Sequence, residues 1–228
     1  IGKICSIAGT TADESATKVI IMSGAGEKSF AAGTDIGSFV DFKTAEDGLH
    51  YESRMESVIE KIETCKVPVI AALHGVVTGG GLIIASAAHL RLASTSVKAG
   101  MPIARTLGNC LSLKNLRRLV ILFGESRVAH MILTAELFEA KDLMSCGFVH
   151  EVLEDKDTLI NRAEEVADSM KLMAPLTISA SIEGLNRIRN SVTMPSDEDL
   201  ISKIYRSVDF KGGVRAFVEK RKPKWQGK

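Results

Sequence analysis

Two glycine-containing turns are the part of this sequence best suited to chemistry. The first spans residues 30–36 (F-A-A-G-T-D-I), and the second spans residues 74–81 and ends in three consecutive glycines. Glycine lets a backbone turn sharply and approach a ligand closely. The three glycines also open an apolar helical stretch at residues 82–89. Free N–H groups at a helix start favour negative charge, so this turn is suited to holding an oxyanion.

The same glycines also have a purely structural interpretation, which is tight packing of a strand against a helix. Two nucleotide-binding interpretations are excluded by spacing. The G-x-G-x-x-G of a dinucleotide fold is absent, and no Gly-Lys-Ser/Thr follows to make a P-loop. Taken alone, the glycines leave the oxyanion site and the packing role open.

The two turns together resemble motifs of the crotonase (enoyl-CoA hydratase/isomerase) superfamily. Residues 21–36 contain I-x-S-G-A-G and F-x-A-G-x-D-I, and residues 68–81 read P-V-I-A-A-x-x-G-x-x-x-G-G-G. The resemblance continues in order through residues 100–149, with G-M-P and G-F-V, to A-F-x-E-K-R-x-P at residues 216–223. This collinear set covers nearly the whole chain from Val19 onward, which makes the resemblance specific.

The resemblance implies an α/β, crotonase-like (ClpP/crotonase) fold of stacked ββα units with a C-terminal α-helical trimerisation region. Residues 1–150 would form the core, apparently without the family's first strand, and residues 151–228 the helical oligomerisation region. The implied partner is an acyl-CoA thioester, with coenzyme A entering only as part of the substrate and no separate cofactor. The implied assembly is a homotrimer or a dimer of trimers.

The resemblance also implies an oxyanion hole made of two backbone N–H groups, which by motif position belong to Thr34 and Gly80. Both would point at the thioester carbonyl oxygen and stabilise the enolate made from it. Positions expected to hold the CoA and acyl groups are Ala32, Asp35, Ile36, Gly79, Ile83, Pro102, Ile103 and Leu107. Phe217 and Lys220 match positions that often touch the CoA of a neighbouring subunit, with helix packing and solvation as the alternative.

The sequence departs from the family where hydratases carry their two glutamates. One glutamate usually stands three residues after the middle glycine, where this chain has Ile83, and the other follows the proline, where it has Ile103. Ala99 also replaces the usual phenylalanine before the glycine of the G-x-P segment. Hydration needs a carboxylate to activate water and an acid to supply the α-proton, and isoleucine does neither.

Other side chains are candidates to take over this chemistry. Asp35 lies beside the first oxyanion donor, although a structural role is the more common one in the family. Arg105, Asn109 and Cys110 follow the altered proline segment and are candidates to face the pocket. Arg105 would pair with a substrate carboxylate through its fixed fork of donors, unless it is an ordinary surface arginine.

Three functions therefore stay open. The family default is a hydratase-like enzyme, an enoyl-CoA hydratase/isomerase-like lyase. The first rival is a decarboxylase of malonyl-type thioesters, because loss of CO₂ makes the enolate without a base and some superfamily decarboxylases also lack the hydratase glutamates. The second rival is a CoA-thioester-binding protein without catalysis.

Hydrophobic patterning places the two turns between buried strands and helices. Short apolar runs predict strands at residues 19–22, 68–73 and 90–93 and a short return at 147–152. Residues 35–43 read as a loop or weak helix. Helical patterns cover residues 49–64, 82–89, 127–134, 140–146, 156–172, 175–189, 197–205 and 213–221. Strands alternating with helices indicate an α/β fold followed by a helical C-terminal part.

Composition limits the class of protein. The 228 residues carry a formal charge of +1, which gives no bulk attraction to nucleic acid or to anionic membranes. The longest apolar runs fall short of the roughly 18 residues of a membrane span.

Four cysteines, at positions 5, 65, 110 and 146, show neither C-x-x-C spacing nor nearby histidine pairs. This predicts no metal site, no disulfide framework and a reduced, cytoplasmic setting. Because the first residue is Ile1, we expect the native start of the protein to be missing. The sequence therefore gives no basis for judging a targeting signal.

Overall fold

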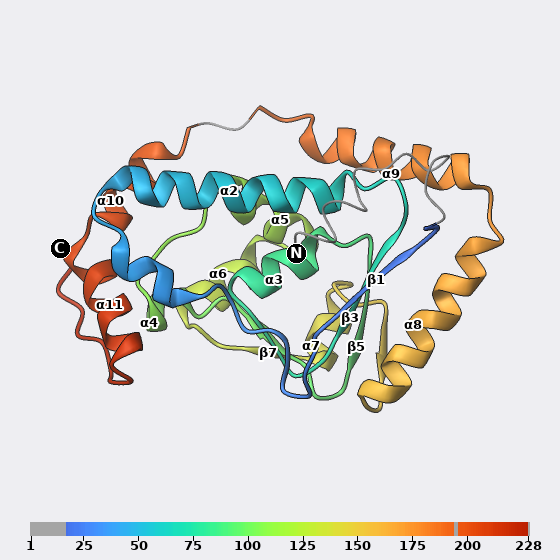
Figure 1. The fold of residues 1–228 in the computed structure, drawn as a ribbon, viewed down its shortest axis with the longest axis horizontal. Helices are drawn as coiled ribbons and strands as arrows, with labels where there is room; N and C mark the ends of the chain where they lie inside the picture. Colours follow the sequence, from blue (N-terminus) through green and yellow to red (C-terminus); the bar gives the residue numbers. More distant parts are fainter. Residues whose placement is uncertain (1–16, 194–195, 228) are drawn as a thin grey trace.

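A computed structural model describes residues 17–193 and 196–227 of the chain (Figure 1). Cys5 and the expected absence of a first strand concern residues outside the described ones. The first six strands alternate between two sheets along the chain. Sheet A has the order β1-β3-β5-β8 and is parallel throughout. Its strands are β1 (Ile20–Ser23), β3 (Val69–Leu73), β5 (Leu90–Ser94) and β8 (Glu151–Leu153).

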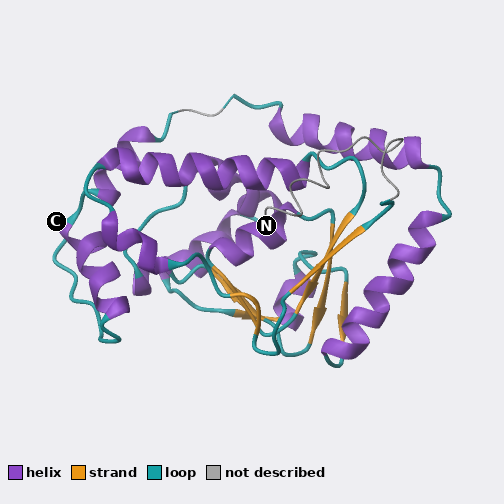
Figure 2. Cartoon of the chain, in the orientation of Figure 1, coloured by secondary structure: helices purple, strands orange, loops and turns teal. Residues whose placement is uncertain are grey.

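Sheet B takes the other strand of each pair and has the order β2-β4-β6-β7. Its strands are β2 (Ser29–Ala31), β4 (Val76–Thr78), β6 (Lys98–Gly100) and β7 (Phe138–Glu139), and only the β6–β7 pair is antiparallel. Figure 2 shows the two groups of strands beside each other. Two strands followed by helix recur along the chain, which confirms the expected crotonase-like arrangement of stacked ββα units.

The helices that follow these strand pairs surround the two glycine turns. After β2 come the short 3₁₀ helix η1 (Ile36–Asp41) and the long helix α2 (Ala45–Glu63). α3 (Gly80–Ala87) follows β4, and α4 (Ile103–Thr106) follows β6. α2 starts where it does because Thr44 and Asp47 form a reciprocal capping box. α3 is apolar on all sides and is buried, as its sequence predicts.

The rest of the chain is mainly helical. These helices are α5 (Leu113–Phe123), α6 (Glu125–Leu133), α7 (Ala140–Ser145), α8 (Lys156–Lys171), α9 (Pro175–Asn190), α10 (Glu198–Tyr205) and α11 (Val208–Val218). α8 packs across sheet A, where Leu159, Ala163 and Ala167 meet Ile70 and Leu92. In Figure 1, α10 and α11 lie together at the end of α2 opposite α9. None of the described helices is both long and apolar enough to cross a membrane.

Two clusters of buried side chains hold the region around the turns. The main core fills the space between the sheets and α2, α3, α5 and α6. A second, aromatic cluster joins η1, α2, α10 and α11 through Phe39, Tyr51, Tyr205 and Phe210. This aromatic cluster ties the C-terminal helices to the chain that follows the first glycine turn.

Some elements differ from those that the sequence pattern predicts. The strands β2, β4, β6 and β7 and the helices α4 and α5 were not predicted. The last helix spans Val208–Val218 rather than residues 213–221, because the Ser207 hydroxyl accepts a hydrogen bond from the Phe210 N–H and begins the helix earlier. The division of the chain at residue 150 stays a prediction, and Glu151–Leu153 belongs to sheet A.

Candidate active site

A cavity of about 350 Å³ lies where the two glycine turns meet. This volume falls at the lower end of the range usual for small-molecule sites. η1, α2, α3, α4 and α11 each contribute to its walls. The walls are mainly apolar and include Phe39, Met55, Ile83, Met101 and Leu107.

Thr34 and Gly80 line this cavity from the two turns. Gly80 is the first residue of α3. A Cβ atom built on Gly80 would lie 3.8 Å from the Thr34 nitrogen and 3.0 Å from Thr34 Oγ1, so the two residues lie side by side. Within residues 17–193 and 196–227, neither N–H donates a hydrogen bond. Two free backbone donors at one place form a site for a developing negative charge.

Neighbouring glycines allow this approach of the two turns. Gly33 and Gly79 have φ angles of 124° and 55°, which side chains rarely adopt. A Cβ on Gly81 would lie 2.1 Å from the Ala31 carbonyl oxygen. Gly81 therefore serves close packing, which is the structural interpretation of these glycines, while Gly80 faces the cavity.

Tyr51 supports the first turn from helix α2. Its hydroxyl and Thr34 Oγ1 share a hydrogen bond of 2.7 Å, and Tyr51 also lines the cavity. Burial raises the pKa of Tyr51, which keeps the phenol neutral and able to donate.

Ten of the twelve residues singled out from the sequence lie on the cavity wall. They are Ala32, Thr34, Ile36, Gly79, Gly80, Ile83, Pro102, Ile103, Leu107 and Phe217. Phe217 is half-exposed, with 51% of its surface accessible, so it forms part of the rim. The role of each residue in binding or catalysis stays a prediction.

Asp35 and Lys220 lie outside this cavity. The Asp35 carboxylate accepts a hydrogen bond of 3.0 Å from the Gly37 N–H and so caps η1. Lys220 is exposed and lies just beyond the end of α11, with a positive φ of 53°. Asp35 therefore has the capping role that was the structural alternative for it.

Ile83 and Ile103 place apolar surface where hydratases of the family carry glutamates. They are 2% and 8% exposed, and both line the cavity. Of the other candidates, Asn109 lines the cavity and Arg105 is exposed away from it. Cys110 packs against the aromatic cluster, and burial raises the pKa of its thiol to about 12, which makes it a poor nucleophile at neutral pH.

A carboxyl group that the sequence analysis missed also borders the cavity. Glu52 of α2 is only 7% exposed and lines the cavity wall. The Tyr205 hydroxyl of α10 donates a hydrogen bond of 2.9 Å to Glu52 Oε1. The signal was present in the sequence, because Glu52 falls on the same helical stripe as the buried residues Gly48 and Ile59.

Burial is the main cause of an unusual protonation state at Glu52. It raises the pKa of this carboxyl to about 7, and the nearby carboxylates of Asp197 and Glu56 add to the effect. Hydrogen bonds from Tyr205 and from the Ser112 backbone oppose it. Near neutral pH, both the protonated and the ionised form are populated.

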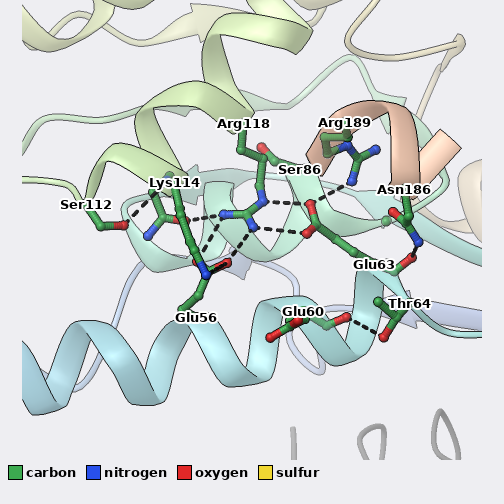
Figure 3. A network of polar contacts seen from close by, with 12 residues as sticks. Glu56, Glu60, Glu63, Thr64, Ser86, Ser112, Lys114, Arg118, Asn186 and Arg189 are labelled. Carbon is green, nitrogen blue, oxygen red and sulfur yellow. Dashed lines mark hydrogen bonds and ion pairs between the residues drawn. The ribbon is translucent and has the colours of Figure 1, made fainter. Parts of the chain in front are cut away.

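A buried ionic network next to the cavity holds α2 against α5 and α9 (Figure 3). Arg118 of α5 donates to both oxygens of Glu63, at 2.7 and 3.0 Å, and to Glu56 at 3.1 Å. Arg189 of α9 donates to Glu63 at 2.7 Å. Arg118 also bonds the side chain of Asn115, which lines the cavity. The network thus fixes one wall of the site.

Comparison with known proteins gives one consistent picture. A family model for enoyl-CoA hydratase/isomerase matches residues 5–228. A probable enoyl-CoA hydratase of Bacillus subtilis is 30% identical over 217 residues, which cover 94% of this chain and 83% of that protein. A short-chain-enoyl-CoA hydratase of Clostridium acetobutylicum is 31% identical, with coverages of 95% and 83%. A solved structure of methylmalonyl-CoA decarboxylase in complex with 2-nitronate-propionyl-CoA is 28% identical, with a TM-score of 0.83 and coverages of 92% and 82%.

Proposed function

The chain belongs to the enoyl-CoA hydratase/isomerase (crotonase) family, and from this membership we propose that its cavity binds an acyl-CoA thioester and stabilises the enolate formed from it. The observation that carries the proposal is the pair of free N–H groups of Thr34 and Gly80 beside an apolar cavity. The thioester carbonyl oxygen would lie between these two donors.

The two donors act on charge that grows during the reaction. An enolate carries more charge on oxygen than the thioester does, so fixed N–H groups stabilise it more than the substrate. The apolar walls exclude water and strengthen this interaction. Ile36, Met101 and Leu107 would contact the acyl chain, and Ala32 and Phe217 at the rim would contact the CoA portion.

Hydratase-like chemistry is our first candidate for the reaction, because curated relatives at about 30% identity include several hydratases. Ile83 and Ile103 argue against the two-glutamate form of that chemistry. Decarboxylation of a malonyl-type thioester is the second candidate. It is favoured by the apolar walls and by the likeness to methylmalonyl-CoA decarboxylase.

We further propose that the protein assembles as a homotrimer or a dimer of trimers. The support is a set of exposed apolar side chains at the end of α8 and along α9, namely Leu172, Met173, Leu176, Leu185, Ile188 and Val192. Apolar surface of this extent is typical of a contact with another chain.

The test is calorimetric titration with acetyl-CoA, crotonyl-CoA and methylmalonyl-CoA, each followed by mass analysis of the thioester. Addition of water to crotonyl-CoA supports the hydratase, and loss of CO₂ from methylmalonyl-CoA supports the decarboxylase. Binding without any conversion supports the non-catalytic alternative. Absence of binding contradicts the proposed function.

A matched pair of glycine variants tests the oxyanion hole. The methyl group of Gly80→Ala would lie 3.0 Å from Thr34 Oγ1 and displace the first donor. We expect turnover of the converted thioester to fall by about 10²–10³-fold, the usual cost of losing one such donor. Gly212→Ala on α11 is the control, because a Cβ there meets nothing within 4 Å. Equal turnover by both variants would contradict the role of Gly80.

A further inference from the structure

Glu52 is the one carboxyl group among the described residues that line the cavity. The same wall contains no aspartate, histidine, lysine or arginine within the described part of the chain. Glu52 projects from α2, whereas the family's two glutamate positions fall in α3 and at the start of α4 and are isoleucine here. A carboxyl side chain thus reaches the cavity from α2, a helix that contains neither of the family's glutamate positions.

The carboxyl group is held in one orientation. Tyr205, which is 1% exposed, donates a hydrogen bond of 2.9 Å to Oε1, and the Ser112 backbone also donates to the group. The ring of Tyr205 is itself fixed, because it packs against Gly48, Phe42 and Phe210. A buried carboxyl with fixed donors cannot swing out to solvent and keeps its position beside the substrate.

Glu52 also borders a second hollow of about 680 Å³, which is lined by residues of α2, the start of α5 and α10. This hollow is lined by polar side chains, including His50, Ser53 and Asp197. The carboxyl group therefore lies between the apolar cavity and a polar, open region. That position suits a group that exchanges a proton with water while facing a dry substrate.

The groups around Glu52 favour a pKa near neutral pH, at which its carboxyl group can both accept and release a proton. Glu56 and Tyr51 face it from α2, Tyr205 and Asp197 from α10 and its cap, and Cys110 from the segment before α5. Lys114 lies beside Glu56 at 3.9 Å and is largely exposed. Burial and the surrounding carboxylates raise the pKa of Glu52 to about 7, where a general base works best at neutral pH.

From the position of Glu52 in the cavity wall, we infer that it is the general base that takes a proton from the carbon next to the thioester carbonyl. This inference rests on the proposed function. The C–H bond breaks, the proton goes to Glu52, and the electron pair moves through the new C=C bond to the carbonyl oxygen. The N–H groups of Thr34 and Gly80 hold that oxygen. Return of the proton to the same carbon, or to the γ-carbon of an enoyl group, restores the carboxylate and needs no further reactant.

Deuterium exchange tests this assignment without requiring the physiological substrate. The full-length protein is incubated with butyryl-CoA in D₂O, and uptake of deuterium at the α-carbon is followed by mass analysis. We expect the wild-type protein to catalyse exchange and Glu52→Gln to lower the rate by about 10²–10⁴-fold. The Kd for butyryl-CoA, measured by calorimetry, should stay within about threefold because the variant keeps the size of the side chain. Glu60→Gln, an exposed position on the same helix, is the control and should exchange at the wild-type rate.

The pH profile gives a readout that a purely structural role would not change. The exchange rate should rise as pH increases through about 7, because the ionised carboxylate is the base. Tyr205→Phe removes a hydrogen bond that lowers the pKa of Glu52, so its midpoint should move to higher pH. This second variant and the wild-type profile keep the test informative even where Glu52→Gln folds poorly.

The outcomes separate the inference from the proposed function. Binding of butyryl-CoA with equal exchange by wild type and folded Glu52→Gln overturns the assignment and leaves the proposed function standing. Binding by the wild-type protein without any exchange has the same meaning. Absence of binding overturns the proposed function, and the inference falls with it.

Discussion

At the scale of single residues, the site keeps the two backbone donors that the family resemblance predicts, but its carboxyl group stands at a different position in the chain. Thr34 and Gly80 lie where the resemblance places the oxyanion donors, and both N–H groups are free within the described residues. Ile83 and Ile103 remove the usual carboxylates, and Glu52 brings one from another helix. Among the described residues, the carboxyl group of the cavity wall therefore comes from α2 and not from the two positions at which hydratases of the family carry glutamates.

Glu52 also predicts how stability depends on pH. Its pKa is about 7 in the folded protein and near 4.5 in the unfolded chain. A raised folded-state pKa means that its contribution to stability is full below pH 4.5 and is lost as pH rises through 7. The Glu52→Gln variant has no carboxyl group to ionise at this position, so it does not lose this stability as pH rises. The free energy of unfolding of the variant, relative to wild type, should therefore increase by about 3 kcal/mol between pH 4 and pH 8.

Urea denaturation of both proteins at a series of pH values measures this difference. All other titrating groups are shared, so their contributions cancel in the comparison. A difference that stays constant from pH 4 to pH 8 would show that the Glu52 carboxyl has an ordinary pKa in the folded protein.

At the scale of elements, α2 is the helix on which the site depends. One end packs against α10 at Gly48, where an added Cβ would meet the Tyr205 ring, and the other end carries Glu63 in the buried ionic network. Tyr51 and Glu52 lie between these ends and face the cavity. Each end of α2 offers a test.

Gly48→Ala tests the contact between α2 and α10. Alanine normally stabilises a helix interior by about 1 kcal/mol over glycine. Here the added Cβ would lie 2.4 Å from Cγ of Tyr205, so the ring must move. We expect a net destabilisation of about 1–3 kcal/mol in urea denaturation, the usual cost of overpacking. Gly212→Ala, in open space on α11, should instead be neutral or stabilising. Stabilisation by Gly48→Ala would show that Tyr205 does not pack as described.

Arg118→Met tests the ionic network at the other end of α2. The substitution leaves the buried carboxylate of Glu63 and the partly buried carboxylate of Glu56 without their main partner. Breaking a buried pair on one side typically costs about 3–5 kcal/mol, which urea denaturation measures directly. Lys141→Met, which breaks an exposed pair with Glu139, should change stability by less than about 1 kcal/mol. A similar small change for Arg118→Met would mean that solvent reaches the network.

The sequence predicted the elements with strong local patterns and missed those set by tertiary contacts. Strands such as Val69–Leu73 and helices such as Lys156–Lys171 follow their apolar runs closely. β4 and β6 are three residues each, too short for a periodic pattern. Motif resemblance singled out Thr34 and Gly80, which both line the cavity, and their role as oxyanion donors stays a prediction. Glu52 was not singled out, because its burial depends partly on Tyr205, which is 153 residues away in the sequence.

At the scale of the whole molecule, the exposed apolar residues of α8 and α9 predict self-association. Leu185→Asp places a charge in the middle of this surface, where it would be buried between subunits at high cost. We expect sedimentation equilibrium to show a trimer or hexamer for wild type and a smaller species for the variant. Glu164→Gln on α8 is an exposed control and should not change the mass. A monomeric wild-type protein would contradict the proposed assembly.

The alternation of strands between two sheets also has a consequence during synthesis. β5 pairs with β8, so Leu92 meets its partner Glu151 only after a long stretch of other structure has been made. The face of sheet A formed by Ile70, Ala72 and Leu92 is covered only when α8 emerges. At usual rates of translation, this leaves the apolar face bare for on the order of several seconds. We therefore expect the yield of the protein in cells to depend on chaperones at the ribosome more than the stability of the finished fold suggests.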